Sequence, residues 1–213
     1  MSKMNLPNRL TVLRMCLVPV ILLVGFLTPQ SADSLFFYIS SAACAAIFIA
    51  ASVTDMLDGK IARRDGLITD FGKFMDPVAD KFMVIGALFV ILYKFPHLEA
   101  VMLATLIIVV FRELAVTSMR LVVSTGSNVV VAANILGKLK TVSQIVAIAT
   151  VFLEPVLQYV ARLIVGAVVG ETLAWRTDVL PLTWLTLAFS IVMTVWSGIN
   201  YLKAYWKFID TDK

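Results

Sequence analysis

The sequence predicts an all-α integral membrane protein with six transmembrane helices. Of its 213 residues, 60% are hydrophobic and only 15% are charged, and its mean hydropathy is +0.93. Soluble domains carry a charge on about a quarter of their residues, so this composition argues against an ordinary soluble enzyme. A membrane-spanning helix needs about 20 residues, so six spans nearly fill the chain. We therefore expect residues 1–213 to form a single domain.

Six apolar segments, separated by turn residues, define the predicted spans. They cover residues 8–28, 34–61, 73–95, 98–123, 134–160 and 180–205. The breaks between them contain residues that favour loops and helix starts: Pro29, Asp33, Pro96, the run Ser124-Thr125-Gly126-Ser127, and Pro181. The segment 161–179 is less regular. Its Gly166 and Gly170 could form a helix contact, but we interpret the segment as a loop.

Basic residues gather on one side of this predicted topology. With a cytoplasmic N-terminus, that side receives Lys3, Arg9, Lys60, Arg63, Arg64, Lys73, Arg120, Lys138, Lys140, Lys203, Lys207 and Lys213. The other side receives Lys94, Arg162 and Arg176. Positive residues are retained on the cytoplasmic side, so we expect both termini at the cytoplasmic face of the cell membrane. The same asymmetry explains the net charge of +4 without a nucleic-acid partner.

Four aspartates lie beside segments that are apolar enough for a bilayer. Asp55 and Asp58 are three residues apart, and Asp76 and Asp80 are four apart. Each pair therefore projects from one face of its helix, and we expect the two pairs to face each other. An ionised side chain in a membrane is costly unless it meets a cavity, a partner or a metal. These four residues are therefore candidates for a functional site.

The donor atoms of this cluster indicate the kind of ion it would bind. Carboxylates without histidine or cysteine favour a hard cation such as Mg²⁺, Mn²⁺ or Ca²⁺. Two divalent cations about 4 Å apart are also a common device for phosphoryl chemistry. An alternative is that the aspartates merely pair with basic residues at the membrane interface, namely Lys60, Arg63, Arg64, Lys73 and Lys81.

Eight positions at fixed spacing carry a family resemblance. They read Asp55-x2-Asp58-Gly59-x2-Ala62-Arg63-x8-Gly72-x3-Asp76-x3-Asp80. This pattern resembles, without a departure, the signature of the CDP-alcohol phosphotransferases. The resemblance implies a bundle of six membrane helices, usually a homodimer. It also implies transfer of a phosphatidyl or similar group from a CDP-linked donor to an alcohol, with release of CMP.

The resemblance also implies roles for individual residues. The four aspartates would bind two Mg²⁺ or Mn²⁺ ions, and Asp80 would also deprotonate the acceptor hydroxyl. Contacts to the CDP-lipid would come from Gly59, Ala62, Arg63, Thr69 and Gly72, and from Asn8, Thr11 and Arg14 on the first helix. For the first helix an alternative stays open, in which Asn8 caps the helix and Arg14 snorkels to the interface.

Four cations on the fourth and fifth segments predict an acceptor pocket. They are Arg112, Arg120, Lys138 and Lys140. Arg112 lies deep in its span, where an unpaired charge is costly, and Arg120 is eight residues further on, about 80° round the helix. A pocket with this many cations suits an acceptor alcohol that carries its own phosphate. Alternatively, Arg112 could pair with a site carboxylate and Lys140 could contact lipid headgroups.

The sequence around these cations resembles one branch of the family. The relevant segments are Leu6-Pro7-Asn8-x-x-Thr11-x-x-Arg14, Phe111-Arg112-Glu113 and Gly137-Lys138-x-Lys140-Thr141. They are similar to the corresponding segments of members that join CDP-diacylglycerol to sn-glycerol 3-phosphate. Membrane lipids would surround such an enzyme.

Three other functions remain open at this point. A sibling enzyme that makes phosphatidylinositol phosphate or cardiolipin would share the aspartates and differ in its acceptor pocket. A divalent-cation transporter should show internal repeats and broken helices, which the sequence does not display. An intramembrane aspartyl protease needs only two catalytic aspartates and no basic pocket.

Overall fold

The computed structural model describes residues 4–30, 34–67, 69–126, 135–169 and 180–206. The helices in these ranges are α1 (Leu6–Phe26), α2 (Leu35–Arg64), α3 (Asp70–Lys94), the short 3-10 helix η1 (Pro96–Leu98), α4 (Glu99–Gly126), α5 (Ile135–Val169) and α6 (Pro181–Tyr205). The described residues contain no strand. The predicted all-α fold class is therefore confirmed.

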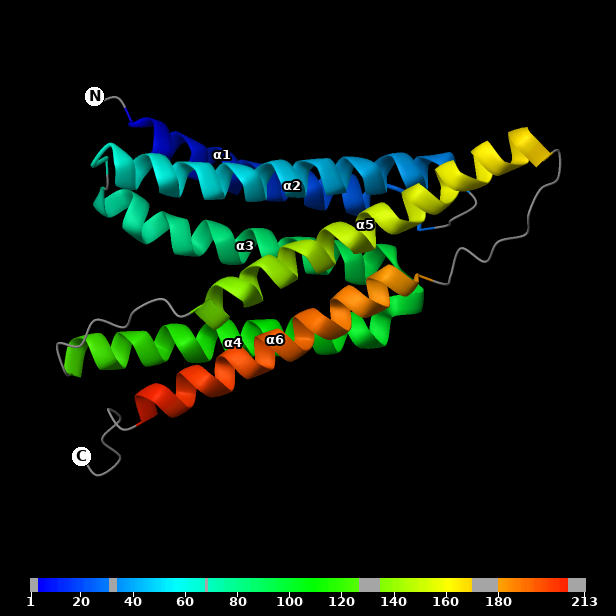
Figure 1. Cartoon of the computed structure of the whole chain (residues 1–213). Helices are drawn as coiled ribbons and strands as arrows, with labels where there is room; N and C mark the ends of the chain where they lie inside the picture. The colour runs from blue at the N-terminus through cyan, green and yellow to red at the C-terminus, as the bar shows by residue number, and fades with distance from the viewer. Residues whose placement is uncertain (1–3, 31–33, 68, 127–134, 170–179, 207–213) are drawn as a thin grey trace.

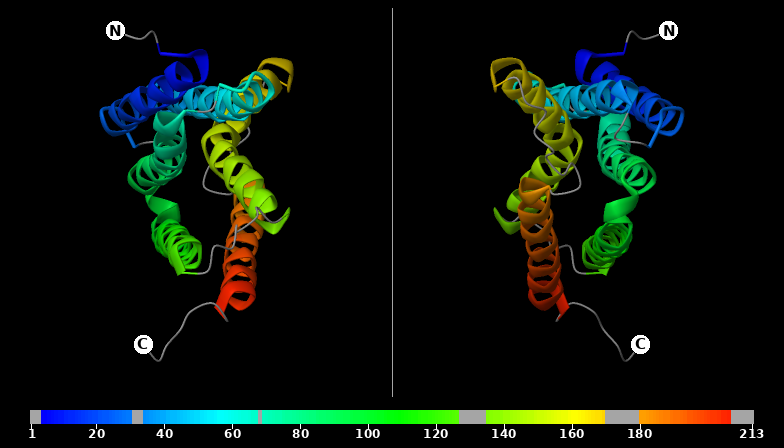
Figure 2. Two further views of the ribbon diagram at one scale, coloured as in Figure 1. Left: turned by 90° about the vertical axis from the view of Figure 1, so that its left-hand side faces the viewer. Right: turned by 90° about the vertical axis from the view of Figure 1, so that its right-hand side faces the viewer.

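The six long helices form an elongated bundle (Figure 1). Viewed from either end, α1 and α2 lie together, α3 and α4 form one flank, and α5 and α6 form the other (Figure 2). Helix α1 packs against α2 and α3, α5 packs against α2 and α6, and α4 packs between α3 and α6. The start of α1, the start of α3 and the end of α6 lie at the same end of the bundle (Figure 1).

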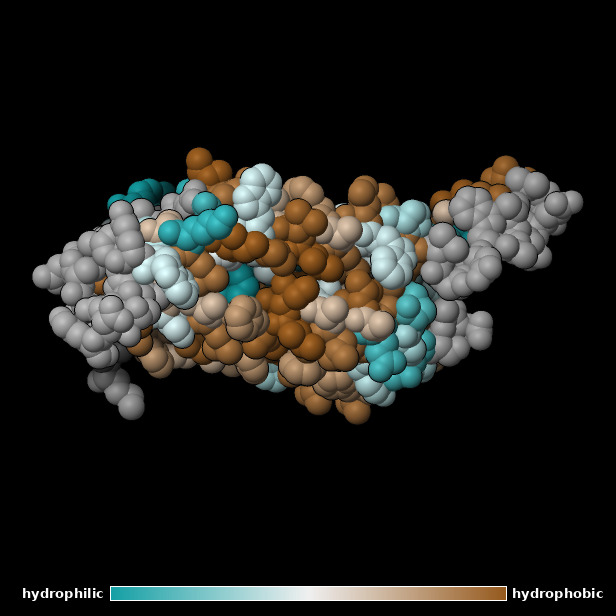
Figure 3. Space-filling view, turned by 90° about the horizontal axis from the view of Figure 1, so that it is seen from below, coloured by the Kyte–Doolittle hydropathy of each residue, from teal (hydrophilic) through white to brown (hydrophobic). Residues whose placement is uncertain are grey.

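Five of the six long helices are long and apolar enough to cross a membrane, which makes the chain a multi-pass membrane protein. Helix α3 is the exception, because its first half carries Asp70, Lys73, Asp76, Asp80 and Lys81. The face on the side of α4 and α6 shows a broad hydrophobic band with hydrophilic residues toward its ends (Figure 3). Such a band suits the hydrocarbon layer of a bilayer.

The structure corrects the interpretation of the segment 161–179. Residues 161–169 continue α5, which ends at Val169, so the predicted loop is wrong for this part. The apolar run from Leu163 to Val168 is interrupted only by Gly166, and a single glycine costs a helix about 1 kcal/mol. Gly170 lies outside the described residues, so the proposed glycine contact does too.

Glycines allow α1 and α3 to pack closely. A methyl group at Gly86 would lie 2.7 Å from Val18 Cγ1, and one at Gly25 would lie 2.2 Å from Val90 Cγ1. Small residues at a helix interface let two backbones approach each other in a membrane. These contacts define a parallel register, which places the first half of α1 beside the charged first half of α3.

A buried lysine ties the helices together at the other end of the bundle. Lys94 is 0% exposed, although the sequence analysis placed it among the residues on the outer side. Its ammonium donates to Ser40 Oγ at 2.7 Å, to Thr28 Oγ1 at 3.0 Å and to the Pro29 carbonyl at 3.4 Å. It also lies 4.7 Å from the centre of the Phe37 ring. One side chain thus joins the end of α3 to α2 and to the segment that follows α1.

We expect Lys94→Ala to lower the free energy of unfolding by about 3 kcal/mol. The substitution removes a fully buried side chain and its hydrogen bonds, and both losses are costly in a packed interior. Thermal unfolding in detergent measures the effect. The control is Lys203→Ala, which changes an exposed lysine on α6 and should leave the unfolding temperature nearly unchanged. Equal behaviour of the two variants would contradict the assigned role of Lys94.

Candidate active site

Three of the four predicted aspartates meet at one arginine. Arg14 of α1 is 0% exposed, and its Nη1 lies 2.5 Å from Asp55 Oδ1 and 2.8 Å from Asp80 Oδ1. Its Nη2 lies 2.5 Å from Asp58 Oδ2. Charge-assisted contacts of a guanidinium with carboxylates are among the strongest polar contacts in proteins. Arg14 therefore does not snorkel to the interface; it holds carboxylates of α2 and α3 together.

The fourth aspartate has a different partner. Thr11 Oγ1 lies 2.6 Å from Asp76 Oδ1 and 3.1 Å from the carbonyl oxygen of Pro7, both within reach of its hydroxyl hydrogen. Helix α1 thus supplies groups that connect α2 with α3, which the expectation of two facing aspartate pairs did not include. Sequence spacing indicated which faces of α2 and α3 carry the aspartates, but it could not indicate which helix packs beside both.

Asn8 and Thr69 close one side of this site. Thr69 Oγ1 donates to Asn8 Oδ1 at 2.9 Å and accepts from the Gly72 amide at 3.1 Å, which caps α3. A methyl group at Gly72 would lie 3.2 Å from Asn8 Oδ1, so glycine permits the close approach. The cap of α1 is Asn5, whose side chain accepts from the Asn8 amide at 3.1 Å. The alternative in which Asn8 caps the helix is therefore wrong.

The other signature positions lie toward the end of α2. Gly59 and Ala62 are partly exposed there, and Arg63 belongs to the same helix, although its side chain lies outside the described residues.

Two basic residues of the interface alternative, Arg64 and Lys73, have other partners. Arg64 pairs with Asp65 at 2.7 Å, and its hydrogen bond holds the pKa of Asp65 below the usual range. Lys73 pairs with Asp70 at 3.0 Å, and both are exposed. Within the part of the chain that the structure describes, the ion pairs of Asp55, Asp58 and Asp80 are instead with Arg14.

The four aspartates offer only oxygen ligands, and such ligands suit a hard cation. No group of three or more His, Cys, Asp or Glu side chains in the described ranges is arranged to hold a metal ion. The positive group that Asp55, Asp58 and Asp80 surround in the structure is the Arg14 guanidinium. Carboxylate oxygens from two helices nevertheless converge on one positive charge, and oxygen-only ligands suit Mg²⁺ and Mn²⁺.

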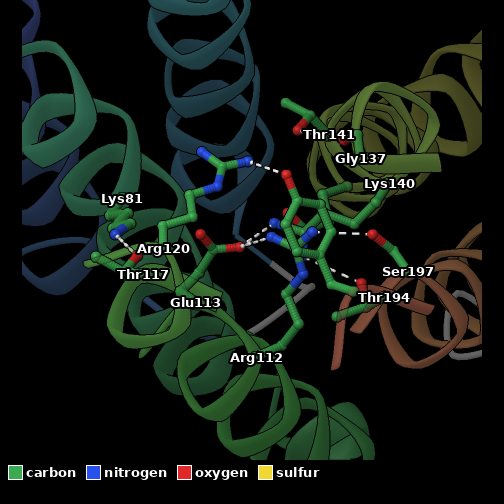
Figure 4. A network of polar contacts seen from close by, with 12 residues as sticks. Lys81, Arg112, Glu113, Thr117, Arg120, Gly137, Lys140, Thr141, Thr194 and Ser197 are labelled. Carbon is green, nitrogen blue, oxygen red and sulfur yellow. Dashed lines mark hydrogen bonds and ion pairs between the residues drawn. The ribbon is translucent and has the colours of Figure 1, made fainter. Parts of the chain in front are cut away.

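A second polar cluster lies between α4, α5 and α6 (Figure 4). We call it the cation network; it consists of Arg112, Glu113 and Arg120 of α4, Lys140 of α5, and Ser197 and Tyr201 of α6.

Contacts within the cation network bring together three of the four cations predicted for the acceptor. Arg112 Nη1 donates to Glu113 Oε1 at 3.0 Å, and Lys140 Nζ donates to the same oxygen. Arg120 Nη2 donates to the Tyr201 hydroxyl at 2.8 Å, and the Arg120 guanidinium carbon lies 5.2 Å from the centre of that ring.

Lys138 is not part of this network. It is exposed, whereas Lys140 is 5% exposed. Two residues along an α-helix differ by about 200° in direction, so Lys138 and Lys140 lie on nearly opposite sides of α5. The expectation that both line one pocket overlooked this helical periodicity.

Sequence reasoning missed three members of the network, namely Glu113, Ser197 and Tyr201. Glu113 carried a signal, because an acidic residue inside an apolar span is as costly as the arginine beside it. Serine and tyrosine carried none, because both are ordinary residues in membrane helices.

The two clusters lie next to each other. Lys81, which follows Asp80 on α3, donates from Nζ to Thr117 Oγ1 of α4 at 2.5 Å. Thr117 is one helical turn beyond Glu113, and Figure 4 shows Lys81 and Thr117 beside the cation network. A cluster of carboxylates therefore adjoins a cluster of cations, and the cations suit a phosphate-bearing substrate.

The chain matches known proteins over nearly its whole length. A family profile described as CDP-alcohol phosphatidyltransferase matches residues 4–196. The CDP-diacylglycerol–glycerol-3-phosphate 3-phosphatidyltransferase of Bacillus subtilis (strain 168) is 36% identical over 212 residues, which cover 97% of this chain and 98% of the relative. The protein of the same name from Yersinia enterocolitica is 33% identical over 208 residues, with 96% and 97% covered. The chain therefore belongs to the CDP-alcohol phosphatidyltransferase family of membrane enzymes.

Proposed function

We propose that this enzyme transfers a phosphatidyl group from CDP-diacylglycerol to sn-glycerol 3-phosphate, giving phosphatidylglycerophosphate and CMP. The observation that carries the proposal is the juxtaposition of the aspartate cluster with the cation network through Lys81 and Thr117. The names of the relatives supply both substrates. Membership of an enzyme family also disfavours the cation-transporter and aspartyl-protease alternatives.

The aspartate cluster is the proposed donor site. Enzymes of this family generally depend on divalent metals, and Asp55, Asp58, Asp76 and Asp80 would hold two Mg²⁺ or Mn²⁺ ions here. Bound ions would supply positive charge for the donor diphosphate and for the departing CMP. Contacts to the donor would come from Asn8, Thr11, Arg14, Gly59, Ala62, Arg63, Thr69 and Gly72.

Asp80 is the proposed general base. Its side chain is 48% exposed although Arg14 contacts Oδ1, so an incoming substrate can reach this carboxylate. A carboxylate within hydrogen-bond reach can take the proton of the acceptor hydroxyl as the alcohol oxygen attacks phosphorus. The new bond joins that oxygen to the phosphorus of the phosphatidyl group, and the bond to CMP breaks.

The cation network is the proposed acceptor site. Arg112, Arg120 and Lys140 would bind the phosphate of sn-glycerol 3-phosphate, because guanidinium and ammonium groups form strong charge-assisted bonds with phosphate. A neutral acceptor such as serine would not need three cations. Lys138 would contribute from the membrane interface at most.

The proposed orientation places the aspartate cluster and both chain ends at the cytoplasmic face of the cell membrane. It is supported by the excess of basic residues on that side and by the shared position of the start of α1 and the end of α6 (Figure 1). The proposed working form is a homodimer of single-domain chains, as in the family.

An acceptor panel tests the proposed function. The purified enzyme receives CDP-diacylglycerol with sn-glycerol 3-phosphate, inositol phosphate, serine or phosphatidylglycerol, and CMP release is measured for each. We expect release with sn-glycerol 3-phosphate to exceed that with every other acceptor. Release with another acceptor alone would identify a sibling enzyme instead.

Substitutions of cations on the two sides of α5 should have different effects on the acceptor KM. We expect Lys140→Ala and Arg112→Ala to raise the acceptor KM at least about tenfold, since a hydrogen bond to a charged group contributes about 1.5–3 kcal/mol. Lys138→Ala is the matched control, because it removes an exposed lysine two residues away. Steady-state CMP release gives the acceptor and donor KM values. A larger effect for Lys138 than for Lys140 would contradict this acceptor site.

A further inference from the structure

Glu113 lies between two cations that both contact one of its oxygens. Arg112 Nη1 is 3.0 Å from Glu113 Oε1, and Lys140 Nζ donates to the same atom. The side chains of all three residues are largely buried, with 12%, 6% and 17% of Arg112, Lys140 and Glu113 exposed. A carboxylate in an apolar span is costly unless it is paired, and here it is paired twice.

The Arg112 and Lys140 cations repel each other, so a carboxylate is needed to hold them side by side. An ammonium and a guanidinium that share one oxygen atom lie close together, and their repulsion is strong where water is scarce. The negative charge of Glu113 offsets that repulsion. One carboxylate cannot neutralise both cations, so a net positive charge remains, and Arg120 adds to it from the same helix.

Helix α6 restrains the cations from the opposite side. Arg112 Nη2 donates to Ser197 Oγ at 2.9 Å, while the Tyr201 hydroxyl accepts from Arg120. Arg112 Nε is buried without a hydrogen-bond partner among the described residues. The network therefore has more donors than acceptors, and its cations are held in place before any substrate arrives.

We infer that Glu113 is a positioning residue that presets Arg112 and Lys140 to receive the phosphate of the acceptor alcohol. This inference rests on the proposed function. Glu113 does not contact the reacting atoms; it acts through the two cations and so favours phosphate-bearing acceptors over neutral ones. Pre-organised groups bind more tightly because less ordering remains to be done on binding.

A substitution that removes only the charge distinguishes positioning from competition. If Glu113 positions the cations, Glu113→Gln should raise the acceptor KM about tenfold and leave the donor KM unchanged. If Glu113 merely competes with the substrate phosphate for the cations, the same substitution should lower the acceptor KM. An unchanged or lowered acceptor KM therefore overturns the inference. The matched control is Glu99→Gln, an exposed glutamate in the first turn of the same helix.

A conservative variant and a binding measurement keep the test independent of folding and turnover. Glu113→Asp retains the charge with a shorter reach, and we expect it to raise the acceptor KM less than Glu113→Gln does. Thermal unfolding is measured with and without sn-glycerol 3-phosphate and inorganic phosphate. Both ligands should raise the unfolding temperature of the unsubstituted enzyme and of Glu99→Gln, but not that of Glu113→Gln.

The two proposals can fail separately. If the unsubstituted enzyme releases no CMP with sn-glycerol 3-phosphate, the proposed acceptor is wrong. The role of Glu113 is then decided by inorganic phosphate alone, through its protection of the protein against thermal unfolding. Protection that Glu113→Gln loses supports the role. Equal protection of both proteins, or none in the unsubstituted enzyme, overturns it.

Discussion

Replacing Asp80 by Asn is expected to reduce the rate of CMP release by about 10²- to 10⁴-fold, the usual contribution of a general base. Asparagine has nearly the same shape, and its amide oxygen can still accept from Arg14, which lies 2.8 Å from Asp80 Oδ1. It cannot take a proton from the acceptor hydroxyl. We therefore expect binding of CDP-diacylglycerol to persist while turnover is lost.

Two measurements separate these effects. Single-turnover CMP release reports the chemical step, and equilibrium binding of CDP-diacylglycerol reports the donor site. The control is Asp70→Asn, which changes an exposed aspartate at the start of the same helix and should retain activity. Substantial turnover by Asp80→Asn would refute the role of Asp80 as base, and a parallel loss of donor binding would show that Asp80 acts only within the donor site.

Replacing Arg14 by Ala is expected to lower the free energy of unfolding by about 3–5 kcal/mol, because removing one partner leaves buried charges uncompensated. Asp58, with 5% of its side chain exposed, would lose the guanidinium that lies 2.5 Å away. Asp55 and Asp80 would lose the same partner. Arg14→Lys keeps the charge but not the planar fork, so it should recover only part of the loss.

Thermal or chemical unfolding in detergent measures this prediction. Arg9→Ala is the control, since Arg9 is an exposed arginine on the same helix. Adding Mg²⁺ should restore part of the stability of Arg14→Ala, because a cation that binds the folded protein stabilises it. If Arg14→Ala were as stable as Arg9→Ala, the guanidinium would not be what holds α2 and α3 together.

The sequence indicated much of this site because its signals are local. Three- and four-residue spacings put Asp55 with Asp58 and Asp76 with Asp80 on single helix faces, and the structure brings all four near α1. Helical periodicity also separates Lys138 from Lys140, a local signal that the sequence analysis did not use.

Contacts between helices could not be predicted in the same way. The position of Arg14 among three carboxylates depends on the register of α1 against α3. In that register Gly25 lies close to Val90, and Gly86 lies close to Val18. The partners of Lys94 depend equally on where α1 and α2 meet the end of α3. No spacing within one helix contains this information.

The sequence by itself determined the membrane class, the approximate spans, the aspartate signature and hence the family, because hydropathy and helical spacing act along one segment at a time. Tertiary structure decided that Arg14 joins three aspartates, that Thr11 contacts Asp76, and that Glu113 lies between Arg112 and Lys140. The physical reason is that a buried charge is stabilised by whichever opposite charge packing brings within about 3 Å. That partner comes from another helix for Arg14 and Lys140, and only packing places it there.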